Sequence, residues 1–173
     1  MSEHKTTKRK NVPSKTNMYM SIAKLISKRS KDPNTQVGAV IVSKDDRILS
    51  IGYNGFPNHC SDDDFPWARD AMSEYDTKYP YVVHSELNAI LNFRGDNKAL
   101  EGSTLYVTLF PCHECAKAII QTGISTIIYL DNKYKDTVDY LESYRMLKAA
   151  SVKLCSYDSL EKEIIEIGDS NPL

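Results

Sequence analysis

The stretch "TLYVTLFPCHECAKAIIQTGISTIIYL", residues 104–130, decides the fold that this sequence predicts. Its apolar run over 104–110 indicates a buried strand, and a helix is expected to begin just after the proline of the "FPC" that follows. A second apolar run over 125–130 predicts another strand. Strands that are separated by a helix pair in parallel, because the crossover returns the chain to the same edge of the sheet. The stretch therefore predicts a strand–helix–strand unit.

The flanking segments extend this unit into a complete α/β domain. Apolar runs over 37–42 and 48–54 surround the polar turn "SKDDR" and predict an antiparallel hairpin. Further helices are expected over 18–30, from about residue 84, over 137–149 and over 159–168, with a last strand over 152–155. We therefore predict an α/β fold, a three-layer α/β/α sandwich whose mixed sheet has about five strands.

Length and composition predict one soluble domain with a short tail. The chain has 173 residues, 41% of them hydrophobic, and a formal net charge of −1. Residues 1–17 are polar and lysine-rich, so we expect a flexible basic tail before a single domain over 18–173. The balanced charge argues against a nucleic-acid binder. No apolar run reaches the roughly 18–20 residues of a membrane span, and no hydrophobic signal segment is visible, so we expect a cytoplasmic protein.

Two short motifs carry metal-binding chemistry. Pro111 suits the first turn of a helix, which places Cys112 and Cys115 together in its opening turn. The exposed N–H groups of such a turn favour thiolates. His84 and Glu86 open another helix in "YVVHSELNAI". Two thiolates and one imidazole are three ligands of the kind that zinc takes, and the fourth position is left for water.

The same motifs match the H-x-E … P-C-x-x-C signature of the zinc deaminases. In that chemistry a metal-activated water attacks an sp² carbon that bears an amino group. Glu86 is then the general acid and base, which takes a proton from the water and returns protons to the ring nitrogen and the leaving ammonia. Two alternatives are a thioredoxin-like redox pair and a closed structural zinc site with His59 or Cys60 as fourth ligand. Outside that alternative, Cys60 and Cys155 are expected to be small buried apolar residues.

Most of the chain, from Tyr19 to Leu154, resembles the deoxycytidylate (dCMP) deaminases of the cytidine deaminase superfamily. The resemblance is carried by "RSKDPNTQVGAVIV", "IGYNGFPNHCSDDDFPW", "HSELNAI" and "LYVTLFPCHECAKAIIQTGI". It implies a cytidine deaminase-like fold, one catalytic zinc per subunit, and hydrolysis of dCMP to dUMP and ammonia in support of dTMP synthesis. It also implies hexamers, activation by dCTP with Mg²⁺, and inhibition by dTTP.

The resemblance also suggests residues that meet the substrate. "RSKDPN" offers Arg29, Ser30 and Lys31 to a phosphate, although the end of a helix is an equally simple reading of this sequence. By resemblance, Tyr134 is a second phosphate candidate, and Asn54 faces the base or sugar rather than serving only as a turn residue. Family members usually carry alanine at the position of Ser85, which we expect to act mainly through its backbone.

The long irregular segment over 55–80 is expected to be a functional lid. By resemblance, Gly55 and the acidic run that includes Asp62, Asp63 and Asp64 belong to an effector site for a magnesium triphosphate, and a solvated loop is the alternative. The leading hypothesis is thus a hydrolase of a small pyrimidine nucleotide. Its rivals are an enzyme that also or instead uses dCTP, another cytosine nucleoside or nucleic-acid deaminase, and a zinc-dependent binding module.

Overall fold

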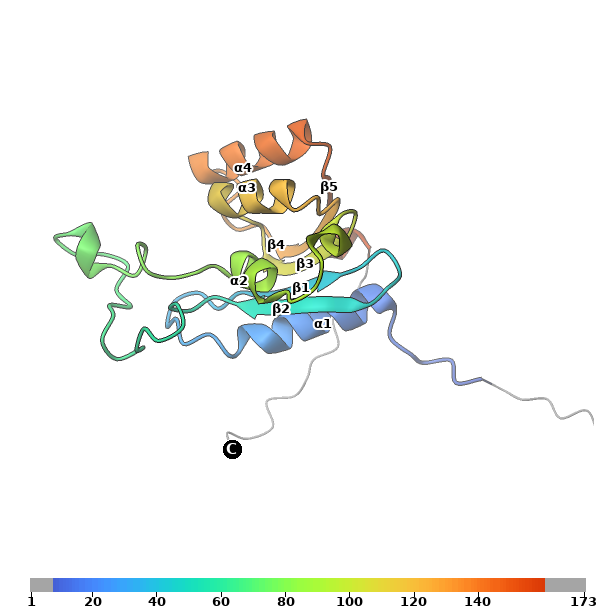
Figure 1. Ribbon diagram of the computed structural model, residues 1–173, viewed down its shortest axis with the longest axis horizontal. Helices are drawn as coiled ribbons and strands as arrows, with labels where there is room; N and C mark the ends of the chain where they lie inside the picture. The colour runs from blue at the N-terminus through green and yellow to red at the C-terminus, as the bar shows by residue number, and fades with distance from the viewer. Residues whose placement is uncertain (1–7, 161–173) are drawn as a thin grey trace, which may run out of the picture.

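The computed structural model describes residues 8–160, and its centre is a five-stranded sheet in the order β2-β1-β3-β4-β5 (Figure 1). The strands are β1 (Gly38–Val42), β2 (Ile48–Tyr53), β3 (Thr104–Leu109), β4 (Thr126–Asp131) and β5 (Lys153–Ser156). β1 runs antiparallel to both β2 and β3, whereas β3, β4 and β5 are parallel to one another. The predicted mixed sheet and its opening hairpin are confirmed.

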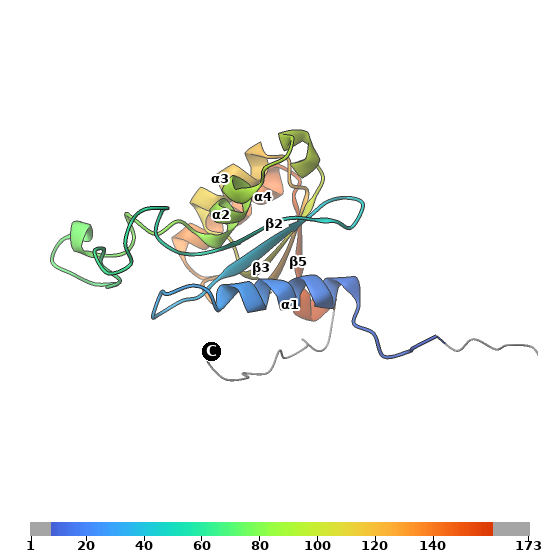
Figure 2. The ribbon, with the colours of Figure 1, turned by 60° about the horizontal axis from the view of Figure 1, so that its bottom comes forward.

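Helices cover both faces of the sheet, as Figure 2 shows. The helix α1 (Lys15–Ser27) lies on one face, and α2 (Ser85–Asn92), α3 (His113–Gln121) and α4 (Val138–Ala149) lie on the other. Three short 3₁₀ helices, η1 (Glu74–Asp76), η2 (Asn97–Leu100) and η3 (Tyr157–Ser159), complete the described elements. The predicted three-layer α/β/α sandwich is confirmed.

The strand β1 shows why the apolar run over 37–42 is continuous. All five of its residues are buried. Ala39 and Ile41 face the core beneath the three helices, whereas Val40 and Val42 face the core beneath α1. Alternate residues of a strand point to opposite faces, so a strand that is covered on both faces has apolar residues throughout.

The ends of α1 differ from the prediction. The helix begins at Lys15, because the Ser14 side chain accepts a hydrogen bond from the backbone N–H of Asn17 and caps the helix. Residues 15–17, which we assigned to the tail, are therefore helical, and the helix ends at Ser27 instead of residue 30. The division of the chain into a tail and one domain otherwise stays a prediction.

Other boundaries shift by smaller steps. Pro111 precedes the helix α3, whose N-cap is Cys112, so the proline is not in the first turn as predicted. Cys60 and Cys155 are half-buried rather than fully buried. The last predicted helix, 159–168, lies almost entirely outside the described residues. Within residues 8–160, no helix combines the length and the apolar content that crossing a membrane requires.

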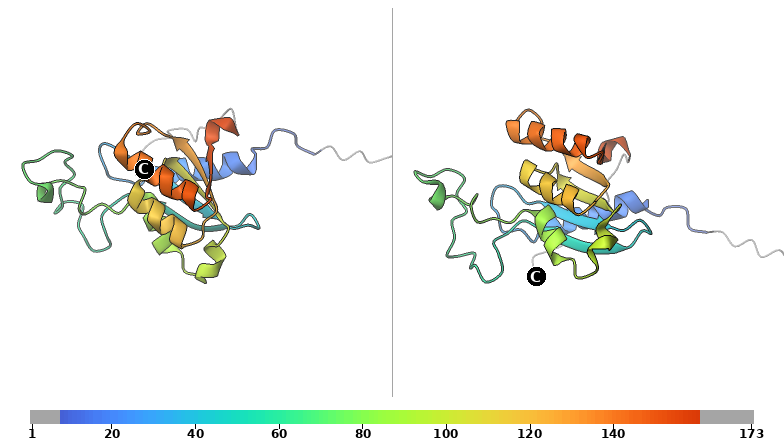
Figure 3. Two further views of the ribbon diagram at one scale, coloured as in Figure 1. Left: turned by 90° about the horizontal axis from the view of Figure 1, so that it is seen from above. Right: turned by 45° about the horizontal axis from the view of Figure 1, so that its top comes forward.

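The long segment between β2 and α2 extends past the edge of the sheet in every view (Figures 1 and 3). Its ends are held together by an antiparallel bridge in which Gly55 and Val83 exchange two backbone hydrogen bonds of 3.1 and 2.9 Å. Inside it, the Phe56 ring packs at a tilt against Trp67 and Phe65, with ring centroids 4.1 and 5.5 Å apart, respectively. The aromatic side chains therefore give this segment a small core of its own.

A close approach of backbones positions α2 on the sheet. Gly52 of β2 lies so near the helix that an added Cβ atom would be 2.3 Å from the Ser85 carbonyl oxygen and 2.4 Å from the Ala89 nitrogen. Only glycine fits at such a distance. The first turn of α2 therefore rests directly on β2, with no side chain between them.

Candidate metal centre and pocket

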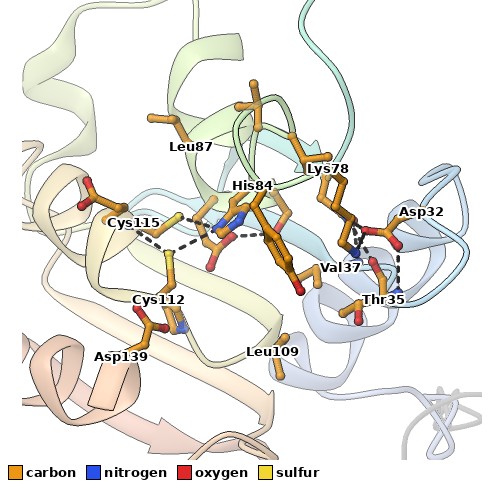
Figure 4. A pocket seen from close by; sticks show the side chains of 18 of the residues that line it. Asp32, Thr35, Val37, Lys78, His84, Leu87, Leu109, Cys112, Cys115 and Asp139 are labelled. Atoms are coloured by element: carbon orange, nitrogen blue, oxygen red, sulfur yellow. Dashed lines mark hydrogen bonds and ion pairs between the residues drawn. The ribbon is translucent and has the colours of Figure 1, made fainter. Parts of the chain in front are cut away.

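Two helix N-termini bring three potential metal ligands together. His84 is the N-cap residue of α2, and Cys112 is the N-cap residue of α3. The His84 Nδ1 atom lies 3.2 Å from the Cys112 sulfur and 3.6 Å from the Cys115 sulfur (Figure 4). Cys115 follows one turn later, and its backbone N–H points at the Cys112 sulfur over 3.5 Å. The predicted set of three is assembled in space.

The geometry of this cluster fits a zinc ion. Bonds of about 2.0–2.3 Å in a tetrahedron separate ligand atoms by roughly 3.3–3.8 Å. The ligand atoms of His84, Cys112 and Cys115 all lie within 4.8 Å of one another, and the two nitrogen–sulfur distances are close to that range. Within residues 8–160 this is the only such group of three or more, and neither His59 nor Cys60 belongs to it. The side chains thus leave one tetrahedral corner open.

The electrostatics of the cluster favour a thiolate. A hydrogen bond from Cys115, with the His84 side chain as a further partner, lowers the pKa of the Cys112 thiol to about 4. The same contact with Cys112 raises the pKa of His84 to about 9. The pKa of Cys115 moves the other way, well above its usual value, because it donates to Cys112 and is buried. The two sulfurs share at least one negative charge, which suits a soft cation.

Glu86 lies beside the cluster in the first turn of α2. Its side chain is 4% exposed, and burial raises its pKa above the usual value. The Ser85 hydroxyl donates a hydrogen bond of 2.8 Å to Glu86 Oε2. Because His84 caps the helix and Glu86 lies within it, the two side chains can serve one site in different roles. Burial thus favours the protonated form of Glu86, which suits a group that accepts and returns protons during a reaction.

The cluster and Glu86 line one cavity of about 760 Å³. Figure 4 places Cys112 and Cys115 on one side of it and Asp32, Thr35 and Lys78 on the other. Cavities of roughly 300–1,000 Å³ are typical of small-molecule sites. The metal centre therefore opens onto a space that suits a small organic substrate.

Polar groups on the far side of the cavity are fixed by a buried network. Asp32 accepts hydrogen bonds from the backbone N–H groups of Asn34 and Thr35 and forms an ion pair with Lys78. Asn54 accepts from the Val37 N–H at 2.8 Å and donates to the Thr35 carbonyl at 2.9 Å and to Asp32 Oδ2 at 3.5 Å. Asn54 thus both lines the pocket and holds the turn that follows α1.

His113 is half-buried at the start of α3. Its ring pairs with the Asp139 carboxylate, which also accepts the His113 backbone N–H at 3.2 Å. This contact joins the N-termini of α3 and α4 at the edge of the pocket, which both residues line.

Only some of the other candidate residues line the pocket. Asn54, Ser85 and Tyr134 line the pocket. Gly55 is engaged in the bridge to Val83. Arg29, Ser30 and Lys31 are not among the lining residues, and neither are Asp62, Asp63 and Asp64. Lys31 instead forms an ion pair with Asp62, which joins a substrate candidate to an effector candidate outside the cavity.

Several polar lining residues were not singled out from the sequence, among them Asp32, Arg69, Lys78 and Asn132. Asp32 has a sequence signal, since an aspartate before proline often accepts hydrogen bonds from the turn that follows. Arg69 and Lys78 lie in the irregular segment, where no periodicity indicates which side chains face a pocket. Asn132 follows β4 directly, in the same "DNKY" motif as Tyr134.

Comparisons with known proteins agree with this site. The cytidine and deoxycytidylate deaminase zinc-binding region, as a family model, matches residues 13–131. A human protein named deoxycytidylate deaminase is 47% identical over 152 residues, which cover 88% of this chain and 84% of the human protein. A Drosophila melanogaster protein named probable deoxycytidylate deaminase is 51% identical over 159 residues, covering 89% of this chain and 77% of the fly protein.

Solved structures give the same relationship. The crystal structure of dCMP deaminase from the cyanophage S-TIM5, in complex with dCMP and dUMP, matches with a TM-score of 0.64 and 29% identity. The match covers 80% of this chain and 93% of the phage chain. The similarity therefore extends over most of this chain and nearly the whole phage chain.

Proposed function

This chain belongs to the cytidine and deoxycytidylate deaminase family, and we propose that it hydrolyses dCMP to dUMP and ammonia. Membership of the family makes it a deaminase, a hydrolase of C–N bonds. The choice of substrate rests on sequence identity to relatives named deoxycytidylate deaminase. The human protein of that name is 47% identical over 88% of this chain. A cavity that joins the histidine–cysteine cluster to a buried glutamate supports the same reaction.

In this proposal His84, Cys112 and Cys115 hold one catalytic zinc ion. When bound in a three-ligand site, zinc acts as a Lewis acid that lowers the pKa of water to about 7. Glu86 takes the two protons of the attacking water one after the other, and it delivers the first to the ring nitrogen and the second to the departing amino group. One water is consumed and one ammonia is released, so Glu86 ends each cycle in its starting state. Ser85 orients the carboxylate through its hydroxyl and presents its backbone to the base.

Substrate contacts are proposed at the residues that line the cavity. Asn54 faces the base or sugar, because its side chain is fixed at the wall opposite the cysteines. Tyr134 lies on that side too and is a phosphate ligand in this scheme. For Arg29, Ser30 and Lys31 the phosphate role stays a prediction, since these residues lie outside the cavity lining.

Regulation and assembly are further parts of the proposal. dCTP with Mg²⁺ is the proposed activator and dTTP the proposed inhibitor, with Gly55, Asp62 and Asp63 in the effector site. Carboxylates and phosphate oxygens are the ligands that Mg²⁺ prefers. A homohexamer is supported by apolar side chains exposed on the edge strand β2 and on α2, namely Ile48, Ile51, Tyr53 and Leu91. A cytoplasmic location would keep the thiols of the metal site reduced.

A substrate panel tests the function. The zinc-loaded protein is offered dCMP, dCTP, deoxycytidine and a cytosine-containing oligonucleotide, and loss of the 4-amino group is followed by absorbance. We expect the highest kcat/KM for dCMP. Preference for dCTP would identify a triphosphate enzyme, and turnover of the oligonucleotide alone would reject the nucleotide proposal. Repeating the assay with dCTP–Mg²⁺ or dTTP as additives, and measuring molecular mass in solution, tests the regulation and the hexamer.

A further inference from the structure

Two basic side chains other than histidine line the cavity, Lys78 and Arg69. The ammonium group of Lys78 is neutralised by Asp32, and both side chains are nearly inaccessible to water, at 8% and 2% exposure. Arg69 has no carboxylate partner among residues 8–160. Its contacts are phenol oxygens, since its Nε atom donates to the Tyr79 hydroxyl at 3.3 Å and its guanidinium also meets Tyr134.

The acidic residues of the cavity leave Arg69 available. Asp32 is paired with Lys78, and Asp139 is paired with His113. Glu114 is paired with Lys117 at 2.6 Å. Glu86 is the proton carrier beside the cysteines. Arg69 is therefore the one lasting positive charge of the cavity lining that no described carboxylate offsets.

The surroundings of Arg69 also favour a negatively charged oxygen. Burial opposes ionisation of the Tyr134 phenol, but hydrogen bonds with Thr35, Lys133 and Arg69 outweigh it and hold the pKa of Tyr134 below its usual value of 10. A place that stabilises a phenolate oxygen offers donors and positive charge to other oxygen anions as well. Figure 4 shows Thr35 across the cavity from Cys112, which puts this end of the pocket away from the metal centre.

We propose that Arg69, together with the hydroxyl groups of Tyr79 and Tyr134, binds the 5′-phosphate of the substrate and makes the enzyme prefer a nucleotide over a nucleoside. The inference rests on the proposed dCMP deamination and names the residue that recognises the phosphate. A guanidinium presents two parallel N–H donors that match two phosphate oxygens, and the phenols donate to a third. Arg69 is exposed at the pocket mouth, so the phosphate stays next to water while the base reaches Glu86.

Paired kinetics on dCMP and deoxycytidine test this role. With Arg69→Gln we expect KM for dCMP to rise about 30-fold or more, because a charged bidentate contact is lost. kcat/KM for deoxycytidine should stay within about twofold, since that substrate has no phosphate to lose. Arg69→Lys keeps the positive charge but loses the two parallel N–H donors of the guanidinium. Its KM for dCMP should therefore lie between those of wild type and Arg69→Gln. Arg47→Gln, which removes an exposed arginine paired with Asp45 in the hairpin turn, is the matched control.

The outcomes separate this inference from the proposed function. Wild-type turnover of dCMP decides the function, and the ratio between Arg69→Gln and wild type decides the inference. An unchanged KM for dCMP, or an equal loss on both substrates, overturns the role of Arg69. If KM for dCMP rises selectively in Arg29→Gln but not in Arg69→Gln, the phosphate is bound by the turn after α1 and not by Arg69. Calorimetric binding of dCMP and deoxycytidine to Glu86→Gln, with and without Arg69→Gln, gives the same comparison in a protein that turns over very slowly. Equal affinities of Glu86→Gln for the two ligands would also overturn the role of Arg69.

Discussion

The Lys78 ammonium group and the Asp32 carboxylate form an ion pair that is almost completely removed from water. The two residues come from opposite ends of the pocket-forming sequence, the turn after α1 and the segment before α2. Through Asp32 the pair reaches Asn54 and the backbone of Thr35. One wall of the cavity is thus held by electrostatic contacts rather than by apolar packing.

Lys78→Met should therefore destabilise the protein more than most surface changes. Removing one partner of a buried pair leaves an uncompensated charge and costs about 3–5 kcal/mol. Lys15→Met is the matched control, because Lys15 pairs with Asp46 where the side chains are 67% and 50% exposed, and exposed pairs contribute only about 0–1 kcal/mol. Urea unfolding of both variants with zinc bound measures the difference. Equal losses in the two would contradict the importance of burial.

Glu86→Gln should separate metal binding from catalysis. The amide keeps the size of the side chain and can still accept the Ser85 hydrogen bond, but it cannot carry a proton. We expect one zinc per chain, as in wild type, and a fall in kcat of about 10²–10⁴-fold. Elemental analysis and steady-state kinetics on the same preparation check both parts. A variant that retains more than a tenth of the wild-type kcat would show that another group moves the proton.

Cys115→Ser should remove the metal. An alcohol is a far poorer zinc ligand than a thiolate at neutral pH, so the zinc content of the purified protein should fall well below one per chain. Cys155→Ser is the control, because Cys155 is half-buried in β5 and lies outside the metal cluster. Treating wild type with a chelator should abolish activity, and added Zn²⁺ should restore it. Full zinc in Cys115→Ser would exclude this cysteine as a ligand.

The pKa of Tyr134 predicts an alkaline limit on substrate binding. The neutral phenol donates to phosphate, whereas the phenolate repels it. Because the pKa of Tyr134 is lowered from its usual value, KM for dCMP should begin to rise at a lower pH than an ordinary tyrosine would cause. In Tyr134→Phe this rise should disappear, leaving a KM that is higher at neutral pH but nearly independent of pH. KM profiles between about pH 7 and pH 10.5 compare the two proteins. Superimposable profiles would exclude Tyr134 from the phosphate site.

Gly52→Ala should displace the first turn of α2 and with it Glu86. The new methyl group would meet backbone atoms of Ser85 and Ala89, so either β2 or the first turn of α2 has to move. Overpacking of this kind costs about 1–3 kcal/mol. Because Glu86 lies in that turn, kcat should fall together with the melting temperature. A variant with wild-type kcat and melting temperature would mean that the helix is not fixed by this contact.

The sequence predicts those parts of the site that depend on short-range spacing. Cys112 and Cys115 are one turn apart, and His84 begins a helix after an apolar run, so their roles follow from local pattern. The partnership of Asp32 and Lys78 does not, because it joins positions 46 residues apart through a segment without periodicity. Arg69 was missed for the same reason. Its position depends on how the aromatic side chains of its own segment pack.

The bridge between Gly55 and Val83 has a consequence for how this protein can change over evolution. It closes the intervening residues into a loop whose two ends lie side by side, so inserted or deleted residues there need not alter the spacing of the sheet. The entropic cost of a longer loop grows slowly, by about 0.6 kcal/mol for each doubling in length. Grafting this loop from a relative with another nucleotide preference should exchange that preference while the zinc-binding residues keep their places.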